Sequence, residues 1–187
     1  MRKLIFQNMV SLDGYFEGPN KELDWHLVDG EFNDYAAGLL DSVDTVLFGR
    51  VTYQLMAGYW PSPAAMTDDP IIAAKMNSLQ KVVFSKTLEK AEWSNTTLIK
   101  DHATEEILKL KQQPGRDIAI FGSSDLVASL GDPGLVDEYR IFVAPIFLGG
   151  GKTLLKGLQR RLSLRLMSSR TFKSGLVLLY YKPAVGQ

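Results

Sequence analysis

The stretch Leu47-Phe48-Gly49-Arg50-Val51-Thr52-Tyr53 joins the end of an apolar strand to the start of a helix. Residues 43–48 predict a buried strand, and Gly49 then lets the backbone approach a ligand closely. Unpaired amides at a helix N-terminus favour phosphate, and Arg50 adds a fork of donors suited to phosphate oxygens. Thr52 brings a hydroxyl for a pyrophosphate. The segment predicts a phosphate site, but a glycine turn beside a surface arginine would have the same sequence.

A second strand, expected at residues 81–85, also ends in polar side chains. Ser85, Lys86 and Thr87 place two hydroxyl groups around a cation, which is the chemistry that a ribose 2′-phosphate requires. Serine, lysine and threonine are also common in exposed turns, so a simple turn is the alternative.

A third strand, expected at residues 117–121, leads into a glycine and two serines. Gly122, Ser123 and Ser124 stand at the start of a helix expected at residues 124–130, a favourable place for a diphosphate. Ser124 could instead cap that helix through its hydroxyl, and one residue can do both. Three such junctions at one edge of a sheet indicate a common nucleotide site.

Strands and helices alternate along most of the chain, which favours an α/β fold. Residues 162–172 and 176–182 predict two closing strands, and Lys173-Ser174-Gly175 between them is a hairpin signal. We expect a three-layer sandwich with a mixed, mostly parallel central sheet and a C-terminal antiparallel hairpin. Binding sites in such sheets lie at the carboxyl ends of the parallel strands. The other expected strands are at residues 4–10, 97–99 and 138–145. The expected helices are at 30–40, from 50 to just before 59, at 71–79 and at 104–112, the last with Thr104 as a cap. Residues 62–70 are expected to form a loop.

The bulk composition is that of an ordinary globular protein. Of 187 residues, 45% are hydrophobic, and the formal net charge is zero, which argues against a broad surface for nucleic acid. Without cysteine and with only two histidines, disulfide frameworks, thiolate metal sites and a histidine-rich metal site are excluded. The N-terminus turns polar at Gln7, too soon for a signal peptide, and no apolar run approaches the ~20 residues that span a bilayer. We expect one cytoplasmic domain over residues 1–187, with no membrane contact.

The three junctions, in this order and spacing, resemble the NADPH-binding segments of the dihydrofolate reductase fold. The closer resemblance is to the branch that includes the reductase domain of bacterial riboflavin biosynthesis. Three further segments support it: Ser11-Leu12-Asp13-Gly14 after the first strand, Val136-Asp137-Glu138-Tyr139, and Pro145-Ile146-Phe147-Leu148-Gly149-Gly150-Gly151. The last of these continues into Lys152-Thr153 and is close to a phosphate loop, but the preceding glycine that such a loop requires is absent, so we reject that interpretation.

The resemblance implies a place for each part of NADPH. Gly49, Arg50 and Thr52 would meet the pyrophosphate and 2′-phosphate region, and Val10 would present backbone groups to the nicotinamide carboxamide. The family often has consecutive glycines at Gly122-Ser123, and in classical dihydrofolate reductases that bond is cis, so its geometry here stays open. The remaining implied contacts are Ser85, Lys86 and Thr87 around the adenosine ribose and its phosphate, and Gly122, Ser123, Ser124 and Leu126 along the diphosphate and nicotinamide.

Hydride transfer to an imine-like carbon also needs a proton, from a buried acid or an ordered water. Asp13 is the preferred substrate-side carboxylate, because it follows the first strand where the nicotinamide would point; its alternative is an ordinary Asp-Gly turn. Asp29 and Glu31 follow Trp25, but each is better interpreted as a helix cap or a first-turn acid. Trp25, Trp60 and Phe147 are possible aromatic walls for a planar ring, and each is also a candidate for the core.

These observations and the resemblance lead to three hypotheses. The first is an NADPH-dependent reductase of a small heterocyclic or carbonyl substrate, either riboflavin-precursor-like or pterin-like. The second is the riboflavin-pathway reductase of a ribosylaminopyrimidine 5-phosphate, which would need a second basic cluster, for which Lys156, Arg160 and Arg161 are candidates. The third is a non-catalytic NADP(H)-binding sensor or subunit. The resemblance also implies a homodimer with the C-terminal strands at or near its interface.

Overall fold

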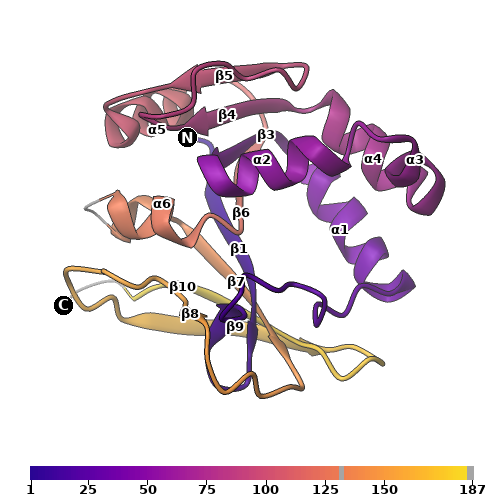
Figure 1. The fold of residues 1–187 in the computed structure, drawn as a ribbon. Coiled ribbons are helices and arrows are strands. Elements are labelled where there is room, and N and C mark those ends of the chain that lie inside the picture. The colour runs from indigo at the N-terminus through magenta and orange to yellow at the C-terminus, as the bar shows by residue number, and fades with distance from the viewer. Residues whose placement is uncertain (131–132, 185–187) are drawn as a thin grey trace.

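The fold is taken from a computed structural model, which describes residues 1–130 and 133–184. These residues form an eight-stranded sheet, a small two-stranded sheet and flanking helices (Figure 1). The strands are β1 (Leu4–Ser11), β2 (Tyr15–Glu17), β3 (Val43–Gly49), β4 (Gln80–Phe84), β5 (Thr96–Ile99), β6 (Asp117–Phe121), β7 (Glu138–Ala144), β8 (Lys152–Thr153), β9 (Leu164–Thr171) and β10 (Val177–Pro183). The helices are α1 (Gly30–Ser42), α2 (Arg50–Tyr59), α3 (Pro63–Asp68), α4 (Pro70–Ser78), α5 (Ala103–Gln112) and α6 (Ser124–Ser129), with a 3₁₀ turn at Pro133–Leu135.

The large sheet has the strand order β5-β4-β3-β6-β1-β7-β10-β9. Every neighbouring pair is parallel except the two that involve β10, which runs antiparallel to β7 and to β9. The register places Leu47 of β3 beside Ile120 of β6, and Gly49 beside Phe84 of β4. The mixed, mostly parallel sheet with a C-terminal antiparallel hairpin is therefore confirmed.

Helices cover both faces of the sheet (Figure 1). On one face, α1, α2 and α4 pack over buried residues of β3 and β4, including Val46, Phe48 and Val83. On the other face, α5 and α6 pack over Phe6 and Ile118. The three-layer arrangement is thus confirmed. In the part of the chain that the structure describes, no helix is long and apolar enough to cross a membrane.

The segment expected as a loop, residues 62–70, instead contains helix α3, so that prediction was wrong. The Ser62 side chain accepts a hydrogen bond from the amide of Ala65 at 3.3 Å, and Pro63 occupies the first turn. Asp69 and Pro70 repeat this arrangement at the start of α4. Proline is favoured in a first helical turn, because its missing amide hydrogen has no partner there. The prolines therefore start two helices here.

Two other local predictions need correction. Helix α5 begins at Ala103, and the Thr104 hydroxyl donates to the carbonyl of Leu130 at 2.9 Å, so it does not cap the helix. The two-stranded sheet of β2 and β8 was not expected, because its strands have only three and two residues. The hairpin turn itself is as predicted: Gly175 has φ +89° and donates to the Phe172 carbonyl at 3.0 Å.

Candidate nucleotide-binding site

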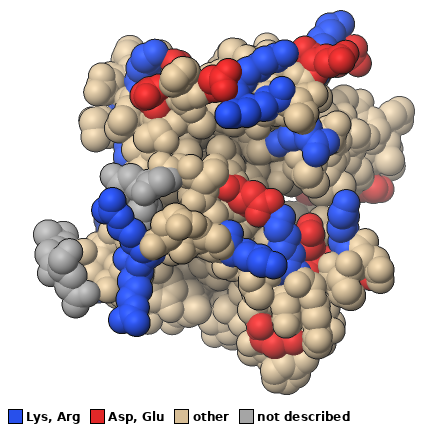
Figure 2. All heavy atoms as spheres, turned by 60° about the vertical axis from the view of Figure 1, so that its left-hand side comes forward, with Lys and Arg blue, Asp and Glu red and all other residues tan. Residues whose placement is uncertain are grey.

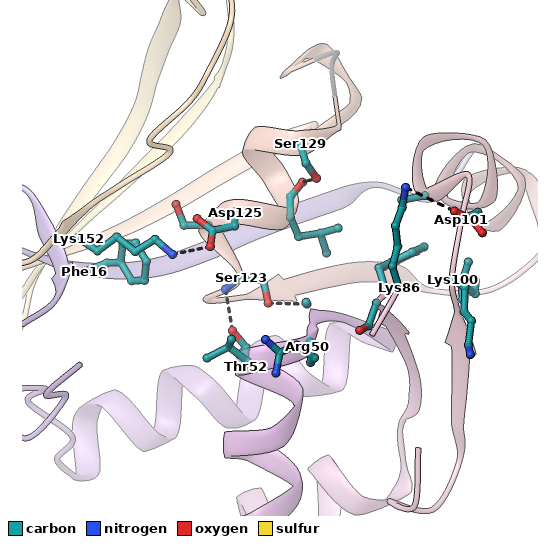
Figure 3. Close-up of a pocket in the computed structure, with 18 of the residues that line it drawn as sticks. Phe16, Arg50, Thr52, Lys86, Lys100, Asp101, Ser123, Asp125, Ser129 and Lys152 are labelled. Carbon is teal, nitrogen blue, oxygen red and sulfur yellow. Dashed lines mark hydrogen bonds and ion pairs between the residues drawn. The ribbon is translucent and has the colours of Figure 1, made fainter. Parts of the chain in front are cut away.

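A cavity of about 590 Å³ lies at the carboxyl ends of β3, β4, β5 and β6 (Figure 3). Its walls come from the segments that follow these four strands and from a fifth region around β2 and β8. Eight of the predicted cofactor residues line it: Gly49, Arg50, Thr52, Ser85, Lys86, Ser123, Ser124 and Leu126. The three junctions that the sequence singled out are therefore brought together in one place.

Three predicted cofactor residues and the predicted carboxylate do not line the cavity. Val10 is buried in β1 beside Val143, and the Thr87 amide donates to Ser85 at 3.2 Å. Gly122 lies just behind the wall, where an added Cβ would come within 3.4 Å of the Thr52 side chain. The ligand contacts predicted for these residues, and for those that line the cavity, stay predictions.

The ends of β3 and β6 are joined by the side chains of Ser123 and Thr52. The Gly49 amide donates to Ser123 Oγ at 2.9 Å, and the Ser123 amide donates to Thr52 Oγ1 at 3.1 Å. Gly122 and Ser123 both adopt left-handed backbone, with φ +57° and +44°, and no described peptide bond is cis. The bond left open by the sequence is therefore trans, and the turn is made by two consecutive left-handed residues.

The start of helix α2 has free backbone donors. Its N-cap is Gly49, which has no side chain with which to accept a hydrogen bond from the first-turn amides. The helix then runs for 10 residues from Arg50. Unpaired amides and the helix dipole together make such an end a favourable site for an anion.

Four hydroxyl groups on the cavity wall are held in the same way. Ser124 Oγ accepts from the Leu155 amide at 2.6 Å, and Ser85 Oγ accepts from the Leu88 amide at 2.9 Å. Ser123 and Thr52 also accept from backbone amides, as described above. Within the described residues, none of the four donates a hydrogen bond. Each hydroxyl can donate as well as accept, so all four O–H groups are free for an acceptor-rich ligand.

Ser124 does not cap helix α6, so that alternative interpretation was wrong. The N-cap position is Ser123, whose left-handed backbone directs its side chain to Gly49 and not to the helix amides. The Ser124 hydroxyl instead holds the segment after β8 through Leu155.

The charges of the lining residues favour an anion overall. Five lining residues are basic and three are acidic. Lys86 pairs with Asp101 at 3.6 Å, and Lys152 pairs with Asp125 (Figure 3). Arg50 has no carboxylate partner among the described residues; its Nη1 lies 3.3 Å from the side-chain oxygen of Gln54. On the face shown in Figure 2, basic and acidic side chains are interspersed.

Two groups of lining residues were missed from the sequence. Lys100, Asp101 and His102 follow β5 and extend the site beyond Ser85 and Lys86. The same strand-end rule would have identified them, since residues 97–99 were already expected as a strand. The other group, Phe16, Glu17 and Lys152, comes from β2 and β8. The sequence shows the glycine run before Lys152, but no local signal indicates that β2 and β8 pair.

Asp13 is exposed, and its carboxylate is fully engaged by neighbouring donors. It accepts from the Ser11 hydroxyl at 2.6 Å, from the Gly149 amide at 2.8 Å and from the Leu148 amide at 3.1 Å. The Ser11 hydroxyl, followed by the two amides, lowers the pKa of Asp13 to about 2. The group is therefore ionised at neutral pH and is not a reservoir of a proton for the reaction. A role as a charged substrate-side group stays a prediction.

The other candidate acids and aromatic walls are placed clearly. Asp29 caps α1 by accepting from the Phe32 amide at 2.8 Å, which confirms its interpretation as a cap. Glu31 pairs with Arg170 at 2.8 Å on the surface. Trp25 and Trp60 pack against buried clusters, whereas Phe147 is 73% exposed and is not a core residue.

Comparison with known proteins gives a consistent result. The family model described as "RibD C-terminal domain" matches residues 2–178. The uncharacterized protein YyaP of Bacillus subtilis is 35% identical over 182 residues, which cover 96% of this chain and 94% of YyaP. A putative riboflavin biosynthesis protein from Shewanella sp. PV-4 has a similar structure, with a TM-score of 0.75, 24% identity and coverage of 97% of this chain and 99% of that one. Dihydrofolate reductase from Enterococcus faecalis, solved with NADP(H), aligns with a TM-score of 0.63 and 16% identity over 97% of this chain and 96% of its own.

Proposed function

Because the chain belongs to the RibD C-terminal domain family, we propose that it is a reductase that uses NADPH to reduce a small heterocyclic or carbonyl substrate. The observation that carries the proposal is the donor set of the cavity. One space of about 590 Å³ is surrounded by four hydroxyl groups, by the α2 N-terminus, which has no side-chain cap, and by Arg50. Among residues 1–130 and 133–184, these hydroxyl groups donate no hydrogen bond and Arg50 has no carboxylate partner. Phosphate groups are acceptor-rich anions, and this donor set is complementary to them.

The residues of the cavity fit the parts of a dinucleotide phosphate. We assign the diphosphate to the α2 amides, Thr52 and Ser123, since these donors lie where β3 and β6 meet. The ribose 2′-phosphate belongs with Ser85 and Lys86, with Lys100 beside them, at the ends of β4 and β5. NADPH, when bound, supplies the hydride. The protein binds and orients it, and the low pKa of Asp13 leaves the proton to another donor.

The narrower hypothesis of a phosphorylated riboflavin precursor receives no support from the basic residues suggested for it. Lys156, Arg160 and Arg161 do not line the cavity, and they lie on the exposed segment between β8 and β9. Leu155 and Leu162 anchor that segment to the core beneath α5 and α6. The broader substrate class is therefore the proposal.

The test is a fluorescence titration of the purified protein with NADPH and with NADH. Arg50→Ala is the test variant, and Arg160→Ala is the matched control, because Arg160 is exposed and lies outside the cavity. Loss of a charged hydrogen bond costs about 1.5–3 kcal/mol, so we expect Arg50→Ala to weaken NADPH binding by about 10- to 150-fold. Arg160→Ala should bind as the wild type does. Absence of binding to either nucleotide would refute the proposal, and tight NADPH binding without turnover of any carbonyl or heterocyclic acceptor would favour a non-catalytic sensor.

A further inference from the structure

Two segments far apart in the chain form one wall of the cavity. Strands β2 and β8 pair antiparallel, with Tyr15 beside Thr153 and Glu17 beside Lys152. They are not part of the large sheet. We call residues 13–17 and 148–153 the flap. Phe16, Glu17 and Lys152 of the flap line the cavity directly.

The Asp13 carboxylate joins the two halves of the flap. One of its oxygens accepts from the Leu148 amide and the other from the Gly149 amide. Ser11 holds the carboxylate in place with its hydroxyl, and Ser11 Oγ in turn accepts from the Tyr15 amide at 3.0 Å. The aspartate carboxylate can accept a hydrogen bond at each of its two oxygens. An asparagine at this position could accept at only one atom, because its other terminal group is an N–H₂ donor that would face one of the two backbone amides.

Close packing within the flap requires a glycine at position 151, whereas an added Cβ at Gly149 or Gly150 would meet nothing within 4 Å. Gly151 has φ +135°, and an added Cβ would come within 2.1 Å of the Glu17 carbonyl oxygen. A side chain at this position would therefore drive β8 away from β2. This contact accounts for the glycine that directly precedes Lys152.

Lys152 connects the flap to the opposite wall. Its ammonium group pairs with Asp125 in the first turn of α6 and lies 5.5 Å from the centre of the Phe16 ring (Figure 3). The flap thus lies across the cavity from β2 to α6. Its position depends on β8 and on the segment before it, where the Asp13 carboxylate holds Leu148 and Gly149.

We propose that Asp13 is a positioning residue, whose carboxylate fixes the glycine-rich segment and so holds Phe16 and Lys152 as the wall that retains the bound nucleotide. The inference rests on the proposed function in one respect, namely that the retained ligand is NADPH. In this proposal Asp13 does not contact the substrate but affects nucleotide binding by holding the flap in place.

The test compares Asp13→Asn with Asp24→Asn, an exposed carboxylate in the loop after β2 that serves as the matched control. Amide hydrogen exchange of the nucleotide-free protein is measured at Leu148 and Gly149, and the rates of NADPH association and dissociation are measured by stopped-flow fluorescence. We expect exchange at both amides to accelerate by at least about tenfold in Asp13→Asn. NADPH dissociation should also accelerate by about tenfold, because a loosened wall retains the nucleotide less well, whereas the association rate should change much less. Asp24→Asn should match the wild type.

A merely structural defect would lower the fraction of protein that binds and leave the dissociation rate of the remainder unchanged, and that result would overturn the proposal. Unchanged exchange at Leu148 and Gly149 would also overturn it. If Asp13→Asn does not fold, Gly151→Ala perturbs the same wall through Glu17 and should show the same faster dissociation. If the wild type binds no NADPH, the proposed function is refuted independently of the role of Asp13. The exchange rates at Leu148 and Gly149 in Asp13→Asn then still show whether Asp13 holds the flap.

Discussion

The Ser123 side chain makes a hydrogen bond from a backbone conformation that disfavours serine, so its two contributions can be separated by mutation. Its Oγ accepts from the Gly49 amide at 2.9 Å, while its backbone lies at φ +44° and ψ +39°. Removal of the hydroxyl leaves a partly buried donor without its acceptor, which costs about 1–3 kcal/mol. The left-handed conformation costs a residue with a Cβ about 1 kcal/mol.

These two magnitudes predict an order of stability. Ser123→Ala loses the hydrogen bond and keeps the backbone cost, so its free energy of unfolding should fall by about 2 kcal/mol. Ser123→Gly loses the same hydrogen bond but relieves the backbone cost, and should be about 1 kcal/mol more stable than Ser123→Ala. Wild type should therefore be the most stable of the three, and the alanine variant the least.

Urea unfolding at equilibrium measures this order, provided that the m-value stays constant. Ser129 is the matched control, because it lies in α6 with a hydroxyl bonded to the Leu126 carbonyl at 2.7 Å. At this helical position glycine is worse than alanine, so Ser129→Gly should be less stable than Ser129→Ala. If Ser123→Ala equals or exceeds Ser123→Gly in stability, the assigned backbone cost is wrong. If both Ser123 variants match the wild type, the bond to Gly49 contributes nothing.

Three other predictions concern ionisation and assembly. Burial lowers the pKa of Lys81 to about 8 from 10.5. The unfolded chain therefore binds more protons between these values, and wild-type stability should rise relative to Lys81→Met by about 2 kcal/mol between about pH 8 and about pH 10 in urea unfolding. A flat difference between the two proteins would contradict it. The lowered pKa of Asp13 predicts a contribution to stability that is present above pH 3.8 and lost as the pH falls toward 2. Thermal unfolding should show this acid loss in the wild type but not in Asp13→Asn. We also propose that a second copy packs against the exposed apolar side chains of edge strand β9, so Leu166→Glu should convert a dimer to a monomer in light scattering, whereas Leu108→Glu on α5 should not. A monomeric wild type would refute this.

The sequence was informative about the site wherever a strand delivered its polar residues directly to the sheet edge. The junctions after residues 48, 84 and 121 meet because their strands are neighbours or near neighbours in a parallel sheet. The same rule extends to Lys100 and His102, because they directly follow β5, whose strand the sequence also predicts at residues 97–99. The prolines between residues 62 and 70 favour a loop when they are considered alone, but a proline directly after a capping serine starts a helix, as Pro63 does in α3.

The flap marks the limit of inference from local sequence. Glu17 and Lys152 become neighbours through a pairing that spans most of the chain, and strands of two and three residues have no periodicity to detect. The two segments that form the flap were nevertheless the ones that composition made conspicuous, as an Asp-Gly turn and a run of three glycines. The two segments contact each other twice, because Asp13 accepts from the amides of Leu148 and Gly149, and Gly151 packs closely against the Glu17 carbonyl. When an α/β sequence contains two turns of this kind without a clear role, a contact between them should be tested before a ligand is assigned to either one.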